Sequence, residues 1–392
     1  MRLAKSQILS ERPDMAEVPV NGKVLQWARE IRGLDVGAAA ELLDIPADEL
    51  LAYESGTKKP LVGFLRRMSA KYRINFTSLL MPEPLPVTKL PTDHRARFGK
   101  PRLSIDTLVA IEEINEALDV FGELSEEIRG LVPKLNIGQA DIKENPAVVA
   151  ARERKRLGVS LKQQREWKGL GHARVEWRKR IEKLGVFTYM IPMPPDELSG
   201  FSLLRDDVAA ICVNDKEPTE GAKIFTLFHE YGHLLLRNTG ISDENNQSRV
   251  ERFCNHFSAS FLIPRANLLE AISERVEDFK APYDFSDADV KHLAASFRVS
   301  NRAIALRLER TGFAPDGFYG RRTAPWDVPT ASKVVTSKSQ PSAIKIRIKR
   351  IGRLHASTVL EAVRRHAINS FDASELIGLQ PGSFKKVEAA LE

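Results

Sequence analysis

The segment Phe225–Arg237, FTLFHEYGHLLLR, holds the residues of this chain whose types and spacing are best suited to chemistry. His229 and His233 are four residues apart, so on an α-helix both imidazoles lie on one face and can reach one metal ion. Glu230 stands beside them. Two histidine ligands with an adjacent glutamate as general base are the arrangement found in zinc peptidases. Zn²⁺ lowers the pKa of a bound water to about 7, so such a site supplies hydroxide at neutral pH.

Glu251 is the residue expected to complete this metal site. A pattern with three fixed positions in five also occurs by chance, but apolar residues surround this one and predict a buried helix, where His and Glu need partners. Gly232 leaves room beside the metal face. Downstream, Glu251 begins ERFCNHFSASFLIP, in which apolar residues recur at helical spacing. A second buried helix would bring Glu251 to the ion, and three protein ligands leave one position open for water.

The sequence leaves several details of this site open. Zn²⁺ is the expected ion, although Mn²⁺ and Fe²⁺ also accept two His and one Glu. Cys254 could be a soft ligand, but the Glu fits the catalytic pattern better, and we interpret Cys254 as a small buried residue. Tyr231, His256 or a residue elsewhere could donate to the oxyanion. Asn255 is a candidate for orienting the His ligands.

These two segments resemble the ImmA/IrrE family of bacterial metallo-endopeptidases. In that family the metal helix is followed by Glu-x-x-Ala-Asn-x-Phe-Ala and a Met/Ile-Pro pair. The matching residues here, with Cys and Ser in place of the two alanines, are Glu251, Cys254, Asn255, Phe257, Ser258, Ile263 and Pro264. The resemblance covers roughly residues 20 to 315 and is most specific over 224 to 264. It implies metal ligation by His229, His233 and Glu251, acid/base catalysis by Glu230, and cleavage of helix-turn-helix repressor proteins.

The elements that must position these residues indicate an α+β protein that is mostly α. Helical periodicity dominates, and the apolar segments GVFTYMIPMP and VAAICVN read as strands. One of these two is expected to form the sheet edge above the metal helix, where an extended substrate can pair with it. GFSLLRDDVAAICVN resembles the strand that precedes the active helix in the ImmA/IrrE family.

The chain of 392 residues is long enough for two or three domains. An N-terminal helix-turn-helix bundle is expected, then a zincin-like metallopeptidase domain with a small sheet, then a short helical C-terminal unit. The predicted segments are a tail (1–20), an Xre-type helix-turn-helix domain (21–82), an extended linker (83–105), the peptidase domain (106–327, with a helix-turn-helix-like piece at 286–313), a second linker (328–342) and a small basic helical unit (343–392).

The N-terminal domain resembles the Xre/Cro type, whose third helix ends in a Glu-x-Gly step, here Glu54-Ser55-Gly56. A recognition helix contacts DNA with its N-terminal residues. Here Asp48 and Glu49 stand at that place, and two carboxylates would repel phosphates. Docking to a protein or dimerisation is therefore as well supported as operator binding. In the C-terminal unit, the basic cluster around Lys345–Arg353 is interpreted mainly as a solvated face.

The composition of the chain bears on its possible partners and on its location in the cell. The net charge of +7 permits nucleic-acid contact without demonstrating it. Two cysteines are too few for a disulfide framework, and we expect neither a signal peptide nor a membrane span, so a cytoplasmic location is predicted.

Two functions of different classes stay open. The first is a regulatory endopeptidase that cuts a helix-turn-helix repressor, with the flanking modules as docking surfaces. The second is a DNA-binding regulator or antitoxin that neutralises a partner toxin, with the metal site structural or conditionally active. Proteins resembling this one, with an Xre-type domain fused to the peptidase domain, are often paired with a toxin.

Overall fold

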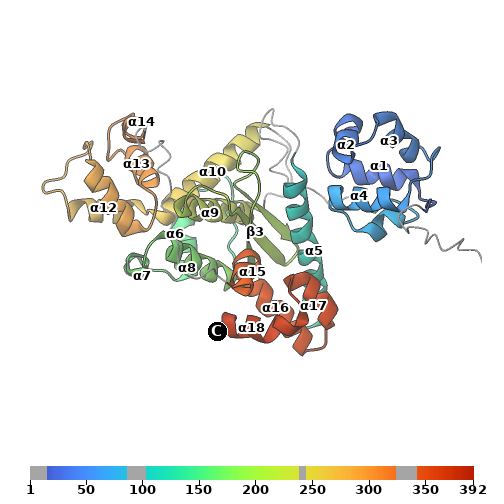
Figure 1. Cartoon of the computed structure of the whole chain (residues 1–392). Coiled ribbons are helices and arrows are strands. Elements are labelled where there is room, and N and C mark those ends of the chain that lie inside the picture. The colour runs from blue at the N-terminus through green and yellow to red at the C-terminus, as the bar shows by residue number, and fades with distance from the viewer. Residues whose placement is uncertain (1–15, 86–102, 238–243, 324–341) are drawn as a thin grey trace, which may run out of the picture. The chain divides into compact units, whose positions relative to one another are not determined.

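A computed structural model describes residues 16–85, 103–237, 244–323 and 342–392. The tail predicted over 1–20 and the linkers predicted over 83–105 and 328–342 lie mostly outside these residues. The described residues fall into two compact units. The first contains residues 16–85 and 103–113, and the second runs from residue 114 to the C-terminus. Helices with one small sheet make up the structure, which confirms the predicted α+β, mostly α class (Figure 1).

The first unit is a bundle of short helices around one core. Its elements are α1 (Gly22–Glu30), α2 (Val36–Leu43), α3 (Ala47–Glu54), α4 (Val62–Tyr72) and the 3₁₀ helix η2 (Phe76–Leu80). Asn21 and Asp35 cap α1 and α2 by accepting hydrogen bonds from backbone N–H groups of the first turn. The buried guanidinium of Arg29 holds the carboxylate of Glu54 through two hydrogen bonds of 2.8 and 2.9 Å. This bidentate pair fixes the end of α3 against α1.

The second unit is built on a three-stranded sheet of order β1-β3-β2. The strands are β1 (Val186–Ile191), β2 (Gly200–Arg205) and β3 (Val208–Asn214). β1 runs parallel to β3, whereas β2 is antiparallel to it. The turn at Asp206 and Asp207 divides GFSLLRDDVAAICVN into two strands, and Asp206 has a φ of 45° there.

The sheet edge beside the metal helix was assigned wrongly from the sequence. Of the two segments considered, VAAICVN is the central strand β3, and GVFTYMIPMP forms β1, which contacts α8 and the C-terminal helices. The edge strand that contacts α9 (Glu220–Leu236) is β2, GFSLLR. The prediction failed because strand order depends on pairing between distant segments, whereas hydrophobic pattern reports only that a segment is a strand.

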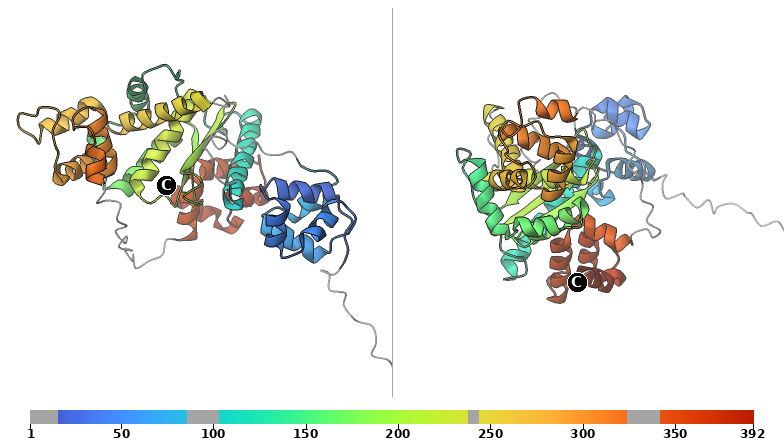
Figure 2. Two further views of the ribbon diagram at one scale, coloured as in Figure 1. Left: turned by 90° about the horizontal axis from the view of Figure 1, so that it is seen from above. Right: turned by 90° about the vertical axis from the view of Figure 1, so that its left-hand side faces the viewer.

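Helices cover both faces of the sheet (Figures 1 and 2). On one face lie α8 (Leu170–Glu182) and α9, and α10 (Glu244–Leu262) packs between α9 and α6 (Pro146–Leu157). On the other face, Phe121 of α5 (Ile105–Glu127) stacks on Phe187 of β1 with ring centroids 4.3 Å apart. One buried apolar cluster joins the first face to the helices behind it. The metal helix α9 is therefore held between the sheet and α10.

The C-terminal unit consists of α15 (Ala343–Ile351), α16 (Arg353–Arg364), α17 (Ser370–Ile377), the 3₁₀ helix η5 (Pro381–Ser383) and α18 (Phe384–Leu391). Both α15 and α16 pack on β1. The basic cluster predicted as a solvated face is exposed at Lys345 and Lys349, but three of its cations also have partners within the protein. Lys349 pairs with Asp215 at 2.7 Å, Arg353 donates to the Ala390 carbonyl, and Arg347 donates to the Ile377 carbonyl. Charge pattern alone could not show that these side chains hold helices together.

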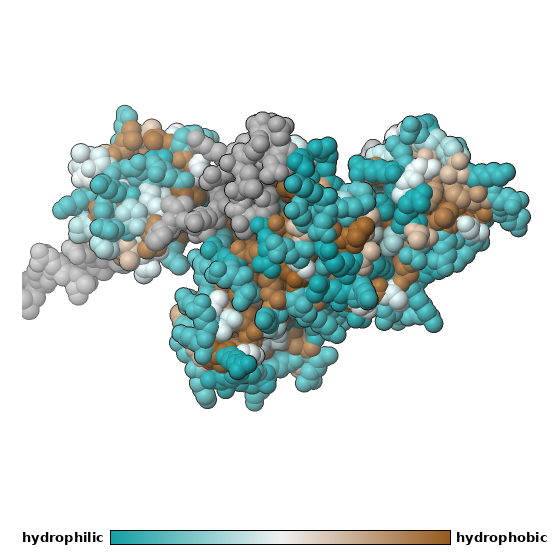
Figure 3. Space-filling model, turned by 180° about the vertical axis from the view of Figure 1, so that it is seen from behind, coloured by the Kyte–Doolittle hydropathy of each residue, from teal (hydrophilic) through white to brown (hydrophobic). Residues whose placement is uncertain are grey.

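The remaining helices are α7 (Leu161–Glu166), α11 (Arg265–Ser273), α12 (Asp287–Phe297), α13 (Asn301–Arg310) and α14 (Phe318–Thr323). In Figure 3, hydrophilic residues cover most of the visible surface, and apolar residues gather in small groups between them. Among the described helices, none has the length and apolar character needed to cross a membrane.

Candidate metal centre

The helix α9 carries both histidines of the predicted site. Thr219 caps it by accepting a hydrogen bond from the N–H of Ala222, and Glu220 in the first turn suits the positive end of the helix dipole. Most of the following residues are buried, because one face of α9 meets the sheet and the other meets α10. His229 is half-buried and His233 is buried, as the apolar flanks of the motif predicted.

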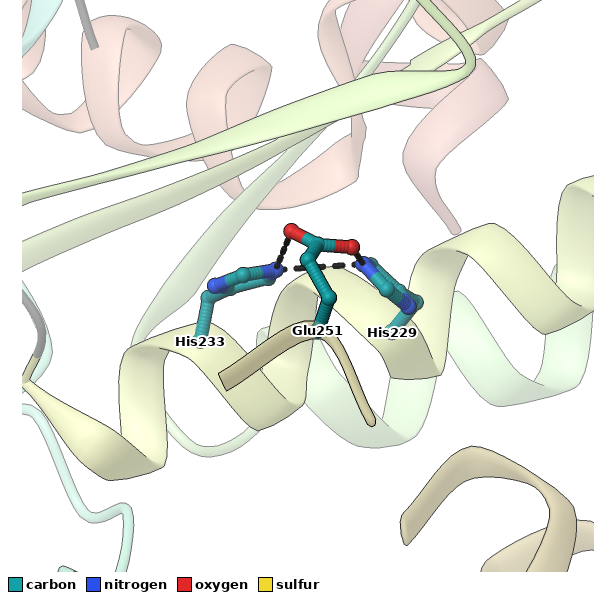
Figure 4. Close-up of side chains that lie close together, drawn as sticks. All are labelled: His229, His233 and Glu251. Carbon is teal, nitrogen blue, oxygen red and sulfur yellow. Dashed lines mark hydrogen bonds and ion pairs between the residues drawn. The ribbon is translucent and has the colours of Figure 1, made fainter. Parts of the chain in front are cut away.

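The imidazoles of His229 and His233, from α9, and the carboxylate of Glu251, from α10, converge on a single point (Figure 4). The Nε2 atoms of His229 and His233 are 3.1 Å apart. Glu251 approaches from the neighbouring helix, with Oε2 lying 3.3 Å from Nε2 of His229 and Oε1 lying 3.4 Å from Nε2 of His233. The structure thus brings together the three residues that the sequence proposed as ligands.

These spacings fit a divalent ion. Two atoms that each bind Zn²⁺ at about 2.1 Å with a tetrahedral angle lie about 3.4 Å apart, close to the separations found here. In the described part of the chain, His229, His233 and Glu251 are the one group of three or more His, Cys, Asp or Glu side chains that could hold a metal ion. Two nitrogens and one carboxylate oxygen are also a donor set that Zn²⁺, Mn²⁺ and Fe²⁺ accept.

The electrostatics of the cluster favour a positive charge at this point. Burial raises the pKa of the Glu251 carboxyl, but hydrogen bonds with His229 and His233 outweigh this and lower the pKa well below its usual range. Burial lowers the pKa of His233, yet Cys254, Glu251 and Glu230 together raise it well above the ordinary value. A half-buried carboxylate facing two imidazoles therefore attracts a proton or a cation, and a metal ion would satisfy it in the same way.

Gly232 lets the two ligand-bearing helices approach each other. A Cβ at this position would lie 3.2 Å from Sγ of Cys254 and 3.3 Å from Cδ1 of Phe257, both on α10. The sequence suggested that Gly232 makes room beside the metal, whereas the structure uses the room for α10. Cys254 is fully buried at this contact, in keeping with its interpretation as a small packing residue. Close packing of α9 and α10 is what sets the position of Glu251.

Glu230 lies under the edge strand β2. It is buried, and its Oε2 accepts a hydrogen bond of 3.1 Å from the hydroxyl of Ser202. Gly200, in the same strand, is required by the close approach of α9, because a Cβ there would meet Thr226 at 2.7 Å. Ser202 was not among the residues predicted from the sequence. The one sign of its role was a polar residue inside the apolar segment GFSLLR, and its partner Glu230 lies 28 residues away.

Three further residues considered from the sequence have defined places. Oδ1 of Asn255 lies 3.1 Å from Nδ1 of His229, where an orienting residue was expected. The hydroxyl of Tyr231 donates to the buried Glu153 at 2.9 Å, so this tyrosine does not serve as an oxyanion donor. Burial, and then repulsion by the positive charges of Arg307 and Arg310, lowers the pKa of His256.

A family model for the IrrE N-terminal-like domain of the peptidase M78 family matches residues 181–309. The matched range includes both ligand-bearing helices and all three strands, and it is shorter than the range of resemblance inferred from the sequence. The match does not extend to the N-terminal helical bundle. No curated protein matches the chain. The resemblance first drawn from the spacing of two histidines and a glutamate is therefore confirmed, and residues 181–309 are an IrrE N-terminal-like domain of the ImmA/IrrE family of peptidases.

Proposed function

We propose that this protein is a metal-dependent endopeptidase in which His229, His233 and Glu251 bind the ion and Glu230 is the general base. The observation that carries the proposal is the convergence of two imidazole nitrogens and the two oxygens of one carboxylate, at separations of 3.1 to 3.4 Å, beside the buried Glu230 in a domain of a peptidase family. The same donor set leaves a coordination position for water and substrate.

Each residue of the proposed site would have its own role in peptide hydrolysis. A divalent ion held by the three ligands would supply Lewis-acid activation of the scissile carbonyl and of the attacking water. Glu230 would accept the proton of that water and pass it to the leaving amine. The hydroxyl of Ser202 donates to Oε2 of Glu230 and so orients this carboxylate. Among the described strands, β2 pairs only with β3, so its outer edge could bind an extended peptide backbone.

Metal analysis of the purified full chain tests the site. We expect about one divalent ion per chain in the wild-type protein, its loss in His233→Ala, and its retention in Glu230→Gln. Glu230→Gln should at the same time abolish peptide cleavage, because the amide cannot take up the proton. A wild-type protein that stays metal-free after reconstitution would refute the metallopeptidase proposal, and cleavage by Glu230→Gln would remove Glu230 from the mechanism.

The substrate we propose is a helix-turn-helix transcriptional repressor. Support comes from the family match together with the separate N-terminal bundle, which is available to recognise one protein partner. Incubation of the metal-loaded protein with helix-turn-helix repressors encoded close to its gene, followed by mass spectrometry of fragments, tests this. A cut that wild type makes and Glu230→Gln does not make is the expected result. Intact repressors in both reactions would argue against this substrate class.

One contact in the bundle supports the alternative of a DNA-binding regulator. Glu49, at the start of α3, accepts hydrogen bonds from Lys58 at 2.6 Å and from Tyr53 at 2.7 Å. The repulsion of phosphates expected from Glu49 is therefore reduced by the adjacent ammonium group. Salt-sensitive binding of the full chain to its own promoter would favour this role if Lys59→Gln, which removes the exposed cation next to Lys58, weakened it. No binding at low salt would exclude it.

A further inference from the structure

A cavity that does not include the metal cluster lies where α6, α10, α11 and α13 meet. Its volume is about 700 Å³, and its wall contains Arg154, Lys155, Arg265 and Arg307. Among the described residues that line it, none is Asp or Glu. A cavity of this size is typical of small-molecule sites, and four cations without a carboxylate make it strongly positive.

Of these cations, Arg307 is buried and Arg154 is half-buried, and neither has a counter-ion among the described residues. The guanidinium of Arg307 is 4% exposed and donates its Nε proton to the carbonyl of Ile263 at 3.0 Å. Arg154 donates to the carbonyl of Phe261 at 2.8 Å and to the amide oxygen of Gln164. All three acceptors are neutral, and no ion pair within the described residues includes either arginine. Buried charges in proteins are normally paired, so the buried Arg307 lacks the partner that burial calls for, and the half-buried Arg154 beside the same cavity has none either.

The lack of a nearby carboxylate among the described residues is also reflected in the pKa values of Arg154 and Arg307. Burial lowers the pKa of Arg154 to about 10. Burial, and then repulsion by Arg265 and Arg310, lowers the pKa of Arg307 to about 10. An anion in the cavity would relieve both effects, because it would restore a favourable environment for the charged guanidinium.

Two neutral donor groups line the same cavity. The hydroxyl of Ser260, in α10, has no hydrogen-bond partner among the described residues, although Ser260 is only 4% exposed. The helix α11 begins there with Pro264 as its N-cap, which offers no side-chain cap. The first N–H groups of a helix have no acceptor within the helix, and they bind phosphate readily. A hydroxyl and a helix N-terminus are thus added to the cations.

We propose that this cavity binds a small molecule carrying a phosphate group. A phosphate has several acceptor oxygens, so it can meet the guanidinium groups of Arg154 and Arg307, the Ser260 hydroxyl and the N-terminus of α11 together. One phosphate fills a small part of 700 Å³, so the rest of the cavity accommodates the body of the molecule. The concave shape favours a small ligand over a nucleic-acid backbone, which binds along open surfaces.

Inorganic phosphate is the probe for the first test, with the full chain and two mild variants. Lys155→Gln removes an exposed cation of the wall, and Ser260→Ala removes a hydroxyl that stabilises nothing in the fold. Lys291→Gln, on an exposed position of α12, is the control with the same change of net charge as Lys155→Gln. Calorimetric titration gives the affinity, and melting at constant ionic strength gives the stabilisation.

We expect phosphate to raise the Tm of wild type in a saturable way and both variants at the cavity to bind it about tenfold more weakly, as the loss of one bond to a charged group implies. Lys291→Gln should bind like wild type. Absence of a phosphate effect on wild type, or equal binding by all variants, would overturn the proposal. Stabilisation by duplex DNA that exceeds that by phosphate and disappears in Lys155→Gln would replace it with a nucleic-acid site.

Discussion

The hydroxyl of Ser202 donates a hydrogen bond of 3.1 Å to Oε2 of Glu230, and so connects the edge strand β2 to the metal helix α9. This contact fixes the carboxylate that we assign as general base, at the place where substrate would pair with the strand. The base and the proposed peptide-binding edge are therefore positioned by one and the same strand.

Replacement of this serine should impair catalysis without affecting the metal. In Ser202→Ala we expect kcat to fall on the order of tenfold, because the Glu230 carboxylate loses its orienting partner, while KM and metal content stay unchanged. Ser202→Thr, which keeps the hydroxyl, should recover most of the rate. Steady-state kinetics with a cleaved peptide and elemental analysis measure these effects. Loss of metal in Ser202→Ala would indicate instead that the strand supports the fold of the site.

A second orienting contact should govern metal affinity. Because Oδ1 of Asn255 lies against Nδ1 of His229, it favours the tautomer that leaves Nε2 available for the ion. Asn255→Ala should weaken metal binding by about 10- to 100-fold. Asn255→Asp, which retains an acceptor oxygen, should bind metal at least as well as wild type. Competition with a chromophoric chelator measures both affinities. Equal affinity in all three proteins would contradict an orienting role.

The close contact of α9 with α10 predicts that a larger residue at position 232 lowers both the stability of the protein and its affinity for metal. In Gly232→Ala the added methyl would lie 3.2 Å from Sγ of Cys254 and 3.3 Å from Cδ1 of Phe257, so both must give slightly, and we expect α10 to shift with them and displace Glu251. We expect a loss of stability of about 1–3 kcal/mol, reduced by the better helix propensity of Ala, and weaker metal binding. The double variant Gly232→Ala with Cys254→Ala should regain part of the affinity, since the sulfur is gone. Urea unfolding and zinc titration give the two quantities.

His355 should make the protein sensitive to moderate acid. Its Nε2 bonds the carbonyl of Leu376 and its Nδ1 bonds the hydroxyl of Tyr189, so the ring is buried in the neutral form. Burial, and then repulsion by Arg347, lowers the pKa of His355 to about 3. The unfolded chain takes up this proton near pH 6.5, so the stabilisation is complete above that pH and decreases as the pH falls towards 3.

The corresponding loss at pH 5 relative to pH 7 is about 2 kcal/mol for this one group. His355→Gln keeps a donor and an acceptor but does not titrate, so it should lose less stability between the two values. Urea unfolding of both proteins at pH 7 and pH 5 isolates the difference, because all other titrating groups are common to them. An equal loss in the two proteins would show that His355 does not contribute.

The convergence of His229, His233 and Glu251 could be predicted from the sequence because it follows largely from local geometry. His229 and His233 are one turn apart, and Glu251 follows in the next helix, so helical periodicity alone brings two of the three together. Asn255 was found for the same reason, as it lies one turn after Glu251. Ser202 was missed because it reaches Glu230 only through the order of strands in the sheet, which depends on pairing between distant segments.

The cavity with unpaired arginines was equally hidden from sequence reasoning. Arg154 lies in a run of charged residues that reads as solvated surface, yet its guanidinium packs over Trp177 and Phe261 at 5.6 and 5.7 Å from the ring centroids. Arg307 comes from a helix more than a hundred residues later in the chain. Whether a cation is exposed or buried depends on which helices close over it, and composition carries no record of that.

The packing of α15 and α16 on β1 has a practical consequence for shortened forms of the protein. The C-terminal helices cover an aromatic face that includes Phe187 and Tyr189, and both residues are buried. Removal of residues 343–392 would expose this face next to a strand edge, a combination that promotes association between chains. A fragment trimmed to the family match would therefore be prone to aggregation, and a soluble peptidase fragment needs the C-terminal helices even though they lie outside the matched range.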